Sequence, residues 1–198
     1  MTGRDFFMPL SAASDTRLTA AQMLRRSACQ LAALRAASAG MVFGPTLDDR
    51  AAMLDRAREE LLQIERAEVL YTKLTGEPLL DAAERVIAEL PAPQSWLEAS
   101  LARLLVCLSA RIELESPRPA AASDEAALAC EVEHVNAAQA ALRELREASG
   151  SAIELPSVFR DKWLAVALQA LPSECARAHY LTTLERDFGL PCSTLRAL

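Results

Sequence analysis

The sequence predicts an all-α, single-domain protein, and its composition supports this fold class in two ways. Hydrophobic residues make up 52% of the 198 residues but aromatic residues only 5%, so Leu, Ala and Val must fill most of the core. Ala and Leu have high helix propensities, whereas strands favour β-branched and aromatic residues. The chain has only 6 Gly, and its 10 Pro lie mainly between apolar runs. A chain of this length suits one domain with a sizeable core.

The first half of the chain contains two long helices and a shorter one. The first is expected over residues 16–39 and should end at Gly40, because Gly commonly follows the last turn of a helix. The second is expected over residues 47–75, with acidic residues at positions 48 and 49 near the positive end of its dipole and Gly76 after its end. A short helix over residues 79–90 should stop at the prolines that follow it.

The second half predicts two more long helices and two shorter ones. A third long helix is expected over residues 95–115, before a proline-rich turn. Ser123 should cap the fourth, which carries a seam of apolar or buried-type positions at 128, 131, 135, 138, 142 and 145 and ends near Gly150. Helices over 157–171 and 173–187 complete the chain. Four long helices favour a four-helix bundle over about residues 16–150, with additional C-terminal helices over about 156–188.

Charge, hydropathy and cysteine content restrict the partners and the compartment. The formal net charge of −6 argues against nucleic acid or an anionic membrane as the main partner. No apolar stretch approaches the roughly 20 residues of a membrane span, and residues 1–20 lack a secretory signal pattern. An odd number of cysteines without close spacing indicates reduced thiols and a cytoplasmic protein. These cysteines are residues 29, 107, 130, 175 and 192.

Glu131 and His134 form the sequence's clearest candidate for a metal-binding pair. A Glu and a His three residues apart project from one helical face, as in di-iron carboxylate sites. The alternative is an ordinary pair of solvent-facing side chains, because charged residues are usually exposed. Glu131 falls on the apolar seam, however, where a charge is costly unless another group pairs with it.

Three stretches of the chain carry a resemblance to a known family: residues 64–76, residues 101–111 with 126–134, and residues 161–168. They resemble the phenylacetic acid catabolic protein family, the ferritin-like subunits of phenylacetyl-CoA monooxygenase. They follow one another in the expected order. The resemblance implies a ferritin-like bundle, with Glu131 and His134 in the ligand positions of the fourth core helix.

The other ligand positions that this resemblance implies are mostly replaced. The first helix offers Ala37 or Ser38, the second offers Gln63 and Arg66, and the third offers Cys107 where an acid is expected. A shift of register by one turn would bring in Glu60 or Glu68 instead. We therefore expect a degenerate site, in which the Arg66 guanidinium reaches Glu131 and replaces the lost metal charge. The acidic pair Glu59-Glu60 is otherwise expected on a solvated face.

Three functions are compatible with this pattern. The first is a non-catalytic subunit without a cofactor, which uses an exposed apolar helix face to bind a second copy or a related ferritin-like subunit. The second is an oxygenase or hydroxylase for a small-molecule or acyl-CoA ligand, with iron or manganese on Glu60, Glu131 and His134. The third is a metal-independent enzyme that uses Arg66, Glu131, His134 and Cys107, where Cys107 is either a reactive thiol or an ordinary apolar filler.

Overall fold

The computed structural model describes residues 20–115, 122–149 and 157–190, and within these ranges the chain is all-α, with no strand. Its helices are α1 (Ala20–Phe43), α2 (Leu47–Thr75), α3 (Leu79–Val86), α4 (Trp96–Glu115), α5 (Ala122–Ser149), α6 (Ser157–Ala170) and α7 (Glu174–Phe188). This confirms the predicted fold class. No helix in the described part of the chain combines the length and the apolar character needed to cross a membrane.

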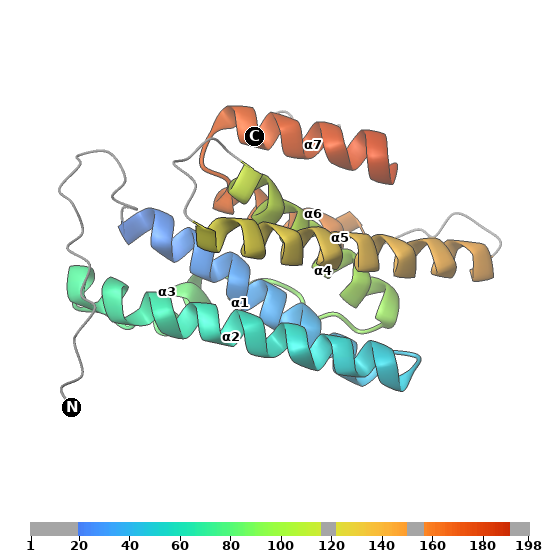
Figure 1. Ribbon diagram of the computed structural model, residues 1–198, viewed down its shortest axis with the longest axis horizontal. Helices are drawn as coiled ribbons and strands as arrows, with labels where there is room; N and C mark the ends of the chain where they lie inside the picture. Colours follow the sequence, from blue (N-terminus) through green and yellow to red (C-terminus); the bar gives the residue numbers. More distant parts are fainter. Residues whose placement is uncertain (1–19, 116–121, 150–156, 191–198) are drawn as a thin grey trace.

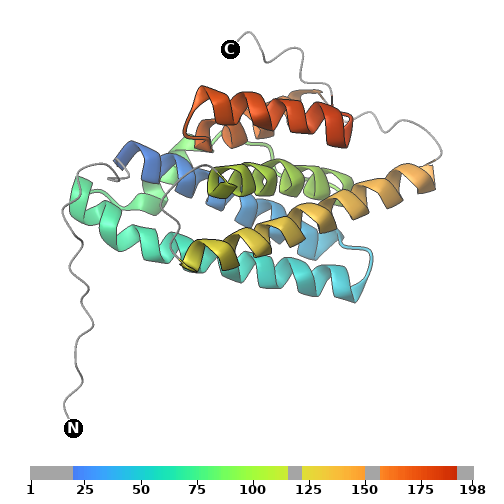
Figure 2. The same cartoon turned by 45° about the horizontal axis from the view of Figure 1, so that its top comes forward.

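Four helices, α1, α5, α6 and α7, pack around α4, which lies in the middle of the molecule (Figures 1 and 2). α1 and α2 run antiparallel and pack along their length, and α1 also contacts α3, α4 and α6. α4 contacts α5 on one side and α6 and α7 on another. Every residue of α4 from Ala99 to Ser109 is buried, as expected of a helix that is surrounded by others.

Local capping chemistry sets the bounds of α2 and α7 where the sequence predicted them. Thr46 and Asp49 form a capping box at the start of α2, and Gly76 ends that helix in the left-handed conformation with φ 76°. The Ser173 side chain accepts a hydrogen bond from the Ala176 backbone N–H at the start of α7. The short helix α3 ends at Val86, four residues before the predicted end.

Two further predicted helix boundaries are wrong. α1 does not end at Gly40 but continues to Phe43. A Cβ at position 40 would lie 2.6 Å from the Met53 Cγ atom, so this glycine permits the close approach of α1 and α2. α5 begins at Ala122, so Ser123 lies within its first turn rather than before it. The predicted start of the first helix, residues 16–19, lies outside the described residues.

The C-terminal helices are attached to the core by buried side chains that satisfy backbone carbonyls. The Tyr180 hydroxyl donates to the Leu105 carbonyl at 2.9 Å, and Ser109 donates to the Ala167 carbonyl at 2.9 Å. Trp163 is fully buried and donates to the Pro91 carbonyl at 3.1 Å. Because these bonds connect α7 and α6 to α4 and the segment before it, the last two helices belong to the same core as the others.

Candidate functional site

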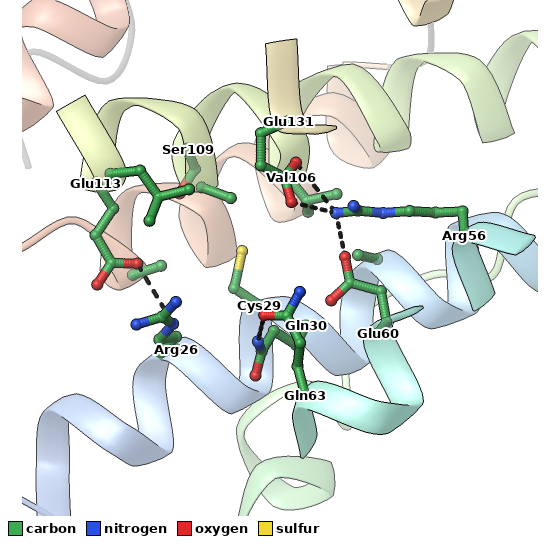
Figure 3. Close-up of a pocket in the computed structure, with 14 residues that line it drawn as sticks. Arg26, Cys29, Gln30, Arg56, Glu60, Gln63, Val106, Ser109, Glu113 and Glu131 are labelled. Carbon is green, nitrogen blue, oxygen red and sulfur yellow. Dashed lines mark hydrogen bonds and ion pairs between the residues drawn. The ribbon is translucent and has the colours of Figure 1, made fainter. Parts of the chain in front are cut away.

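A buried arginine connects α2 to α5 at the centre of the molecule. Arg56 and Glu60 stand one turn apart on the buried face of α2, and their side chains are only 3% and 2% exposed. The Arg56 Nη2 atom donates to Glu131 Oε1 at 2.9 Å and to Oε2 at 3.2 Å, and it also pairs with Glu60. Figure 3 shows the two carboxylates approaching the guanidinium from opposite sides. The cation therefore occupies the space between them.

The other terminal nitrogen of Arg56 fixes the protonation of His134. Nη1 lies 2.6 Å from His134 Nδ1 and 3.6 Å from Glu59 Oε2. Since a guanidinium only donates, Nδ1 must accept, and the imidazole proton belongs on Nε2. Burial, followed by repulsion from Arg56 and Arg103, lowers the pKa of His134 to about 3. His134 is therefore a neutral hydrogen-bond acceptor for Arg56.

The predicted pairing of Arg66 with Glu131 is wrong, and the predicted solvated position of Glu60 is wrong as well. Arg66 is exposed on α2, and Arg56 makes the contact with Glu131. Ten residues separate the two arginines, which places them about 15 Å apart along the helix and on different sides of it. Glu59 is partly exposed as predicted, but its neighbour Glu60 faces the core.

Both buried carboxyl groups resist ionisation in spite of the adjacent arginine. Burial raises the pKa of Glu60 to about 8, although the charge of Arg56 acts in the opposite direction. Burial also raises the pKa of Glu131, against the attraction and the hydrogen bonds of Arg56. The second oxygen of Glu60, Oε2, is buried and has no hydrogen-bond partner within the described residues. The site thus contains one fixed cation, Arg56, and two carboxyl groups whose ionised form is disfavoured by burial.

Cys107, the predicted nucleophile or apolar filler, lies close to this site on α4. Its side chain is buried, and burial raises its pKa to about 12 even though Arg56 and Arg103 favour the thiolate. Nucleophilic cysteines require a substantial thiolate fraction near neutral pH. The structure therefore favours the interpretation of Cys107 as a protonated, packed side chain.

A small cavity adjoins Arg56, Glu60 and Glu131. Its volume is about 40 Å³, and polar side chains from α1, α2 and α4 line it. Gln30 donates to Gln63 at 2.6 Å, and Arg26 lies 3.9 Å from Glu113 (Figure 3). At about 10–15 Å³ for each water, this cavity has room for roughly three water molecules. It is far too small for an acyl-CoA.

The sequence interpretation missed Arg56 and the cavity residues of α1 and α4, although a signal for Arg56 was present. Met53, Ala57 and Ile64 form a helical apolar stripe, and Arg56 and Glu60 fall within it at i, i+4 spacing. An oppositely charged pair inside an apolar stripe indicates a buried ion pair. Gln30 and Glu113 carry no comparable signal, since their neighbours do not reveal which of them converge.

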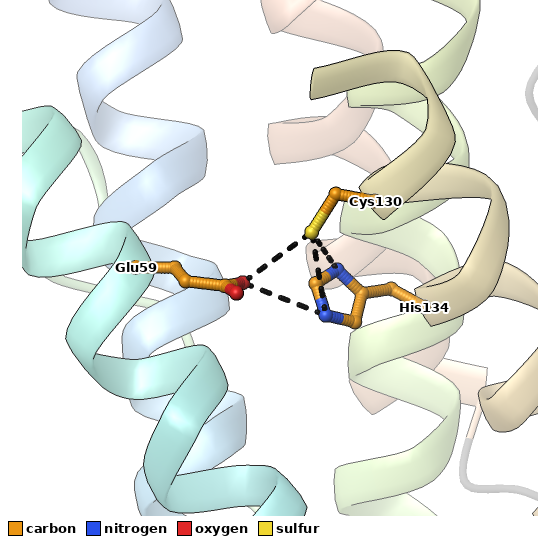
Figure 4. Close-up of side chains that lie close together, drawn as sticks. All are labelled: Glu59, Cys130 and His134. Carbon is orange, nitrogen blue, oxygen red and sulfur yellow. Dashed lines mark hydrogen bonds and ion pairs between the residues drawn. The ribbon is translucent and has the colours of Figure 1, made fainter. Parts of the chain in front are cut away.

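Three side chains at the edge of the site lie in a triangle that matches metal-coordination distances. Glu59 Oε2 is 3.6 Å from Cys130 Sγ and 3.5 Å from His134 Nε2, and the Cys130 Sγ–His134 Nε2 distance is 3.9 Å (Figure 4). Tetrahedral zinc with normal bond lengths would separate such atoms by about 3.3–3.6 Å. Cys107, Glu131 and His134 form a second group whose potential ligand atoms lie within 4.8 Å of one another.

The protonation state of His134 opposes metal binding at the first of these triangles. His134 Nε2 faces the triangle, but it carries the proton as long as Nδ1 accepts from Arg56. Burial, with repulsion from Glu59, also raises the pKa of Cys130 to about 11. Glu60, which the sequence assigned to the alternative metal set with Glu131 and His134, belongs to neither group and pairs with Arg56. The predicted Glu60–Glu131–His134 set therefore already contains a cation, the Arg56 guanidinium.

Comparison with known proteins identifies no relative: no family model, no curated protein and no solved structure matches the chain.

Proposed function

We propose that this chain is a non-catalytic, ferritin-like structural subunit in which the Arg56 guanidinium takes the place of the metal ions. The observation that carries this proposal is the contact of one buried cation with Glu60, Glu131 and His134. An arginine cannot coordinate a metal, and its charge compensates carboxylates that a metal would otherwise neutralise.

The distribution of polar side chains over the four long helices supports the ferritin-like part of the proposal. Ferritin-like di-iron sites take one Glu from each of two helices and a Glu-x-x-His motif from each of the other two. Here α5 contributes Glu131 and His134, and α2 contributes Glu60 and Gln63 at the same i, i+3 spacing. α1 and α4 contribute Gln30 and Glu113 to the adjoining cavity. This arrangement agrees with the alternative register of α2 considered above, in which the ligand positions shift by one turn from Gln63 and Arg66 to Glu60 and Gln63.

The chemistry of the site supports a structural role over a catalytic one. Arg56 holds His134 as a neutral acceptor, and Cys107 remains a protonated thiol. Catalytic acids and bases usually have pKa values near the working pH, and the pKa of Glu60, about 8, lies near that range. Glu60 is buried beside a cavity that admits water but not an organic substrate.

Elemental analysis of protein purified without chelator and without added metal tests the proposal. We expect no stoichiometric iron or manganese in the wild type, and the same result in Glu131→Ala. Near-stoichiometric iron or manganese that disappears in Glu131→Ala would overturn the proposal and favour the oxygenase.

A metal-dependent function at the Glu59–Cys130–His134 triangle is the second candidate, because of its near-tetrahedral distances. The same analysis separates it from the oxygenase. Zinc lost in Cys130→Ser but retained in Glu131→Ala would support this second candidate, since Cys130 belongs only to the triangle and Glu131 only to the buried site.

A further inference from the structure

The outer face of α2 carries an apolar stripe that no described part of the chain covers. Leu47, Leu54, Leu61, Leu62 and Val69 are all exposed, from 40% for Leu54 to 83% for Leu47. Leu61 and Leu62 are adjacent, and the other residues follow at spacings of seven or eight, which places the set on one side of the helix. The buried residues of α2 occupy the other side, and α2 lies at the edge of the molecule in both views (Figures 1 and 2). A contiguous exposed stripe of this kind is typical of a binding surface.

Four of the five stripe residues, all but Leu47, are arranged symmetrically about one point. The midpoint between Leu54 and Val69 falls between residues 61 and 62, the two leucines at the centre. If a second copy of α2 packs antiparallel across a two-fold axis at that point, Leu61 faces the partner's Leu62 and Leu54 faces the partner's Val69. Such an interface is isologous, because the same patch is used by both copies.

The charged residues of the stripe have the same symmetry and opposite signs. Arg58 and Glu65 also have their midpoint between residues 61 and 62, and both are exposed. Seven residues separate them, or about 10.5 Å of helix, so they are too far apart to pair within one copy. Arg58 lies 3.6 Å from Asp55 in an exposed pair, and Glu65 has no ion-pair partner within the described residues. In the antiparallel pair each Arg58 would face the partner's Glu65, whereas a parallel pair in register would oppose like charges.

We infer that the outer face of α2 is the interface of a symmetric homodimer, in which the two copies of α2 pack antiparallel about a two-fold axis between Leu61 and Leu62. A second copy is the occupant because the face is complementary to itself in both its apolar and its charged residues. The inference does not depend on the proposed metal-free site, since Arg56 lies on the opposite, buried face of α2. Finding a metal in the core would overturn the proposed metal-free site but not the dimer. Finding a monomer would overturn the dimer but not the metal-free site.

Sedimentation or light scattering of the full chain at micromolar concentration tests the surface. We expect a dimer for the wild type and a monomer for the double variant Leu61→Glu/Leu62→Glu. Val158→Glu is the matched control, because Val158 is 66% exposed on α6 and lies outside the stripe. This control should remain dimeric. A monomeric wild type, or a dimer that survives in the double leucine variant, would overturn the inference.

Charge reversal tests the antiparallel register. Arg58→Glu alone and Glu65→Arg alone each place two pairs of like charges across the interface, so each should weaken self-association about tenfold or more. An equimolar mixture of the two variants restores both opposite-charge pairs and should form a heterodimer. The double variant Arg58→Glu/Glu65→Arg should form a homodimer again. If neither the mixture nor the double variant recovers association, the antiparallel register is wrong, even if the leucine variant is monomeric.

Discussion

The Arg56 guanidinium on α2 donates to both carboxylate oxygens of Glu131 on α5, at 2.9 and 3.2 Å. The two residues are 75 positions apart in the chain, and both are almost fully buried. A buried ion pair of this kind is not by itself a source of stability, because desolvation offsets much of the attraction. Its importance is that either partner would be left as an uncompensated charge if the other were removed.

Replacing Arg56 with Met should destabilise the protein by about 3–5 kcal/mol, because Glu131 would stay buried without its positive partner and Glu60 would lose the contact with Arg56. Urea unfolding at fixed pH and protein concentration measures the change. Arg66→Met is the matched control, since Arg66 is an exposed arginine on the same helix and should be nearly neutral. Equal losses in the two variants would show that Arg56 has no special role.

The smaller variant Arg56→Ala tests whether the arginine stands in for a metal. It leaves Glu60, Glu131 and His134 without their cation, so added Co²⁺ should bind and raise the unfolding midpoint. The wild type should not respond to Co²⁺ in the same way. Absence of any stabilisation in Arg56→Ala would show that these three side chains cannot hold a divalent ion.

The pKa of Glu60 predicts a specific dependence of stability on pH. Burial raises this pKa from its ordinary value of 4.5 to about 8, so between these pH values the folded state retains a proton that the unfolded chain has released. The contribution of Glu60 to the free energy of unfolding therefore falls as pH rises from about 4.5 to about 8. The variant Glu60→Gln, which has no carboxyl group at this position, removes this pH-dependent contribution to the free energy of unfolding.

Urea midpoints of the wild type and Glu60→Gln, compared across this pH range, check the prediction. The advantage of Glu60→Gln over the wild type should grow with pH. His134 has the opposite effect, because its pKa in the folded state, about 3, lies below its ordinary value of 6.5. Its contribution to the free energy of unfolding is therefore lost as pH falls from 6.5 toward 3. Since both proteins contain His134, this second effect largely cancels in the comparison. Parallel pH profiles would contradict the raised pKa of Glu60.

The buried thiols should be inert in the native protein. Burial raises the pKa of Cys29 well above its ordinary value and that of Cys107 to about 12, so neither supplies thiolate near neutral pH. In a Cys175→Ser/Cys192→Ser background, a disulfide reagent should not modify Cys29 or Cys107 until denaturant is added. Cys130, which is only partly buried, should react slowly. Rapid native modification of Cys107 would instead support the metal-independent enzyme.

Local sequence chemistry determined the elements of this fold. Thr46 with Asp49, Gly76 and Ser173 mark helix ends through hydrogen bonds and backbone conformations that depend only on nearby residues, and the observed bounds agree with them. The buried positions of α5, including Glu131, also follow from spacing alone, because helical periodicity fixes which residues share a face.

Only the tertiary structure decided which residues meet. The apolar stripe of the second helix indicates that Arg56 is buried, but it does not show that Arg56 meets Glu131. That contact depends on the rotation and axial register of α2 against α5. The role of Gly40 also depends on tertiary structure. The sequence does not distinguish a glycine that ends a helix from one that, like Gly40, lets the Met53 side chain of α2 approach closely. Helix bounds depend on interactions within a few residues, whereas contacts between helices depend on how all the side chains of the core pack together.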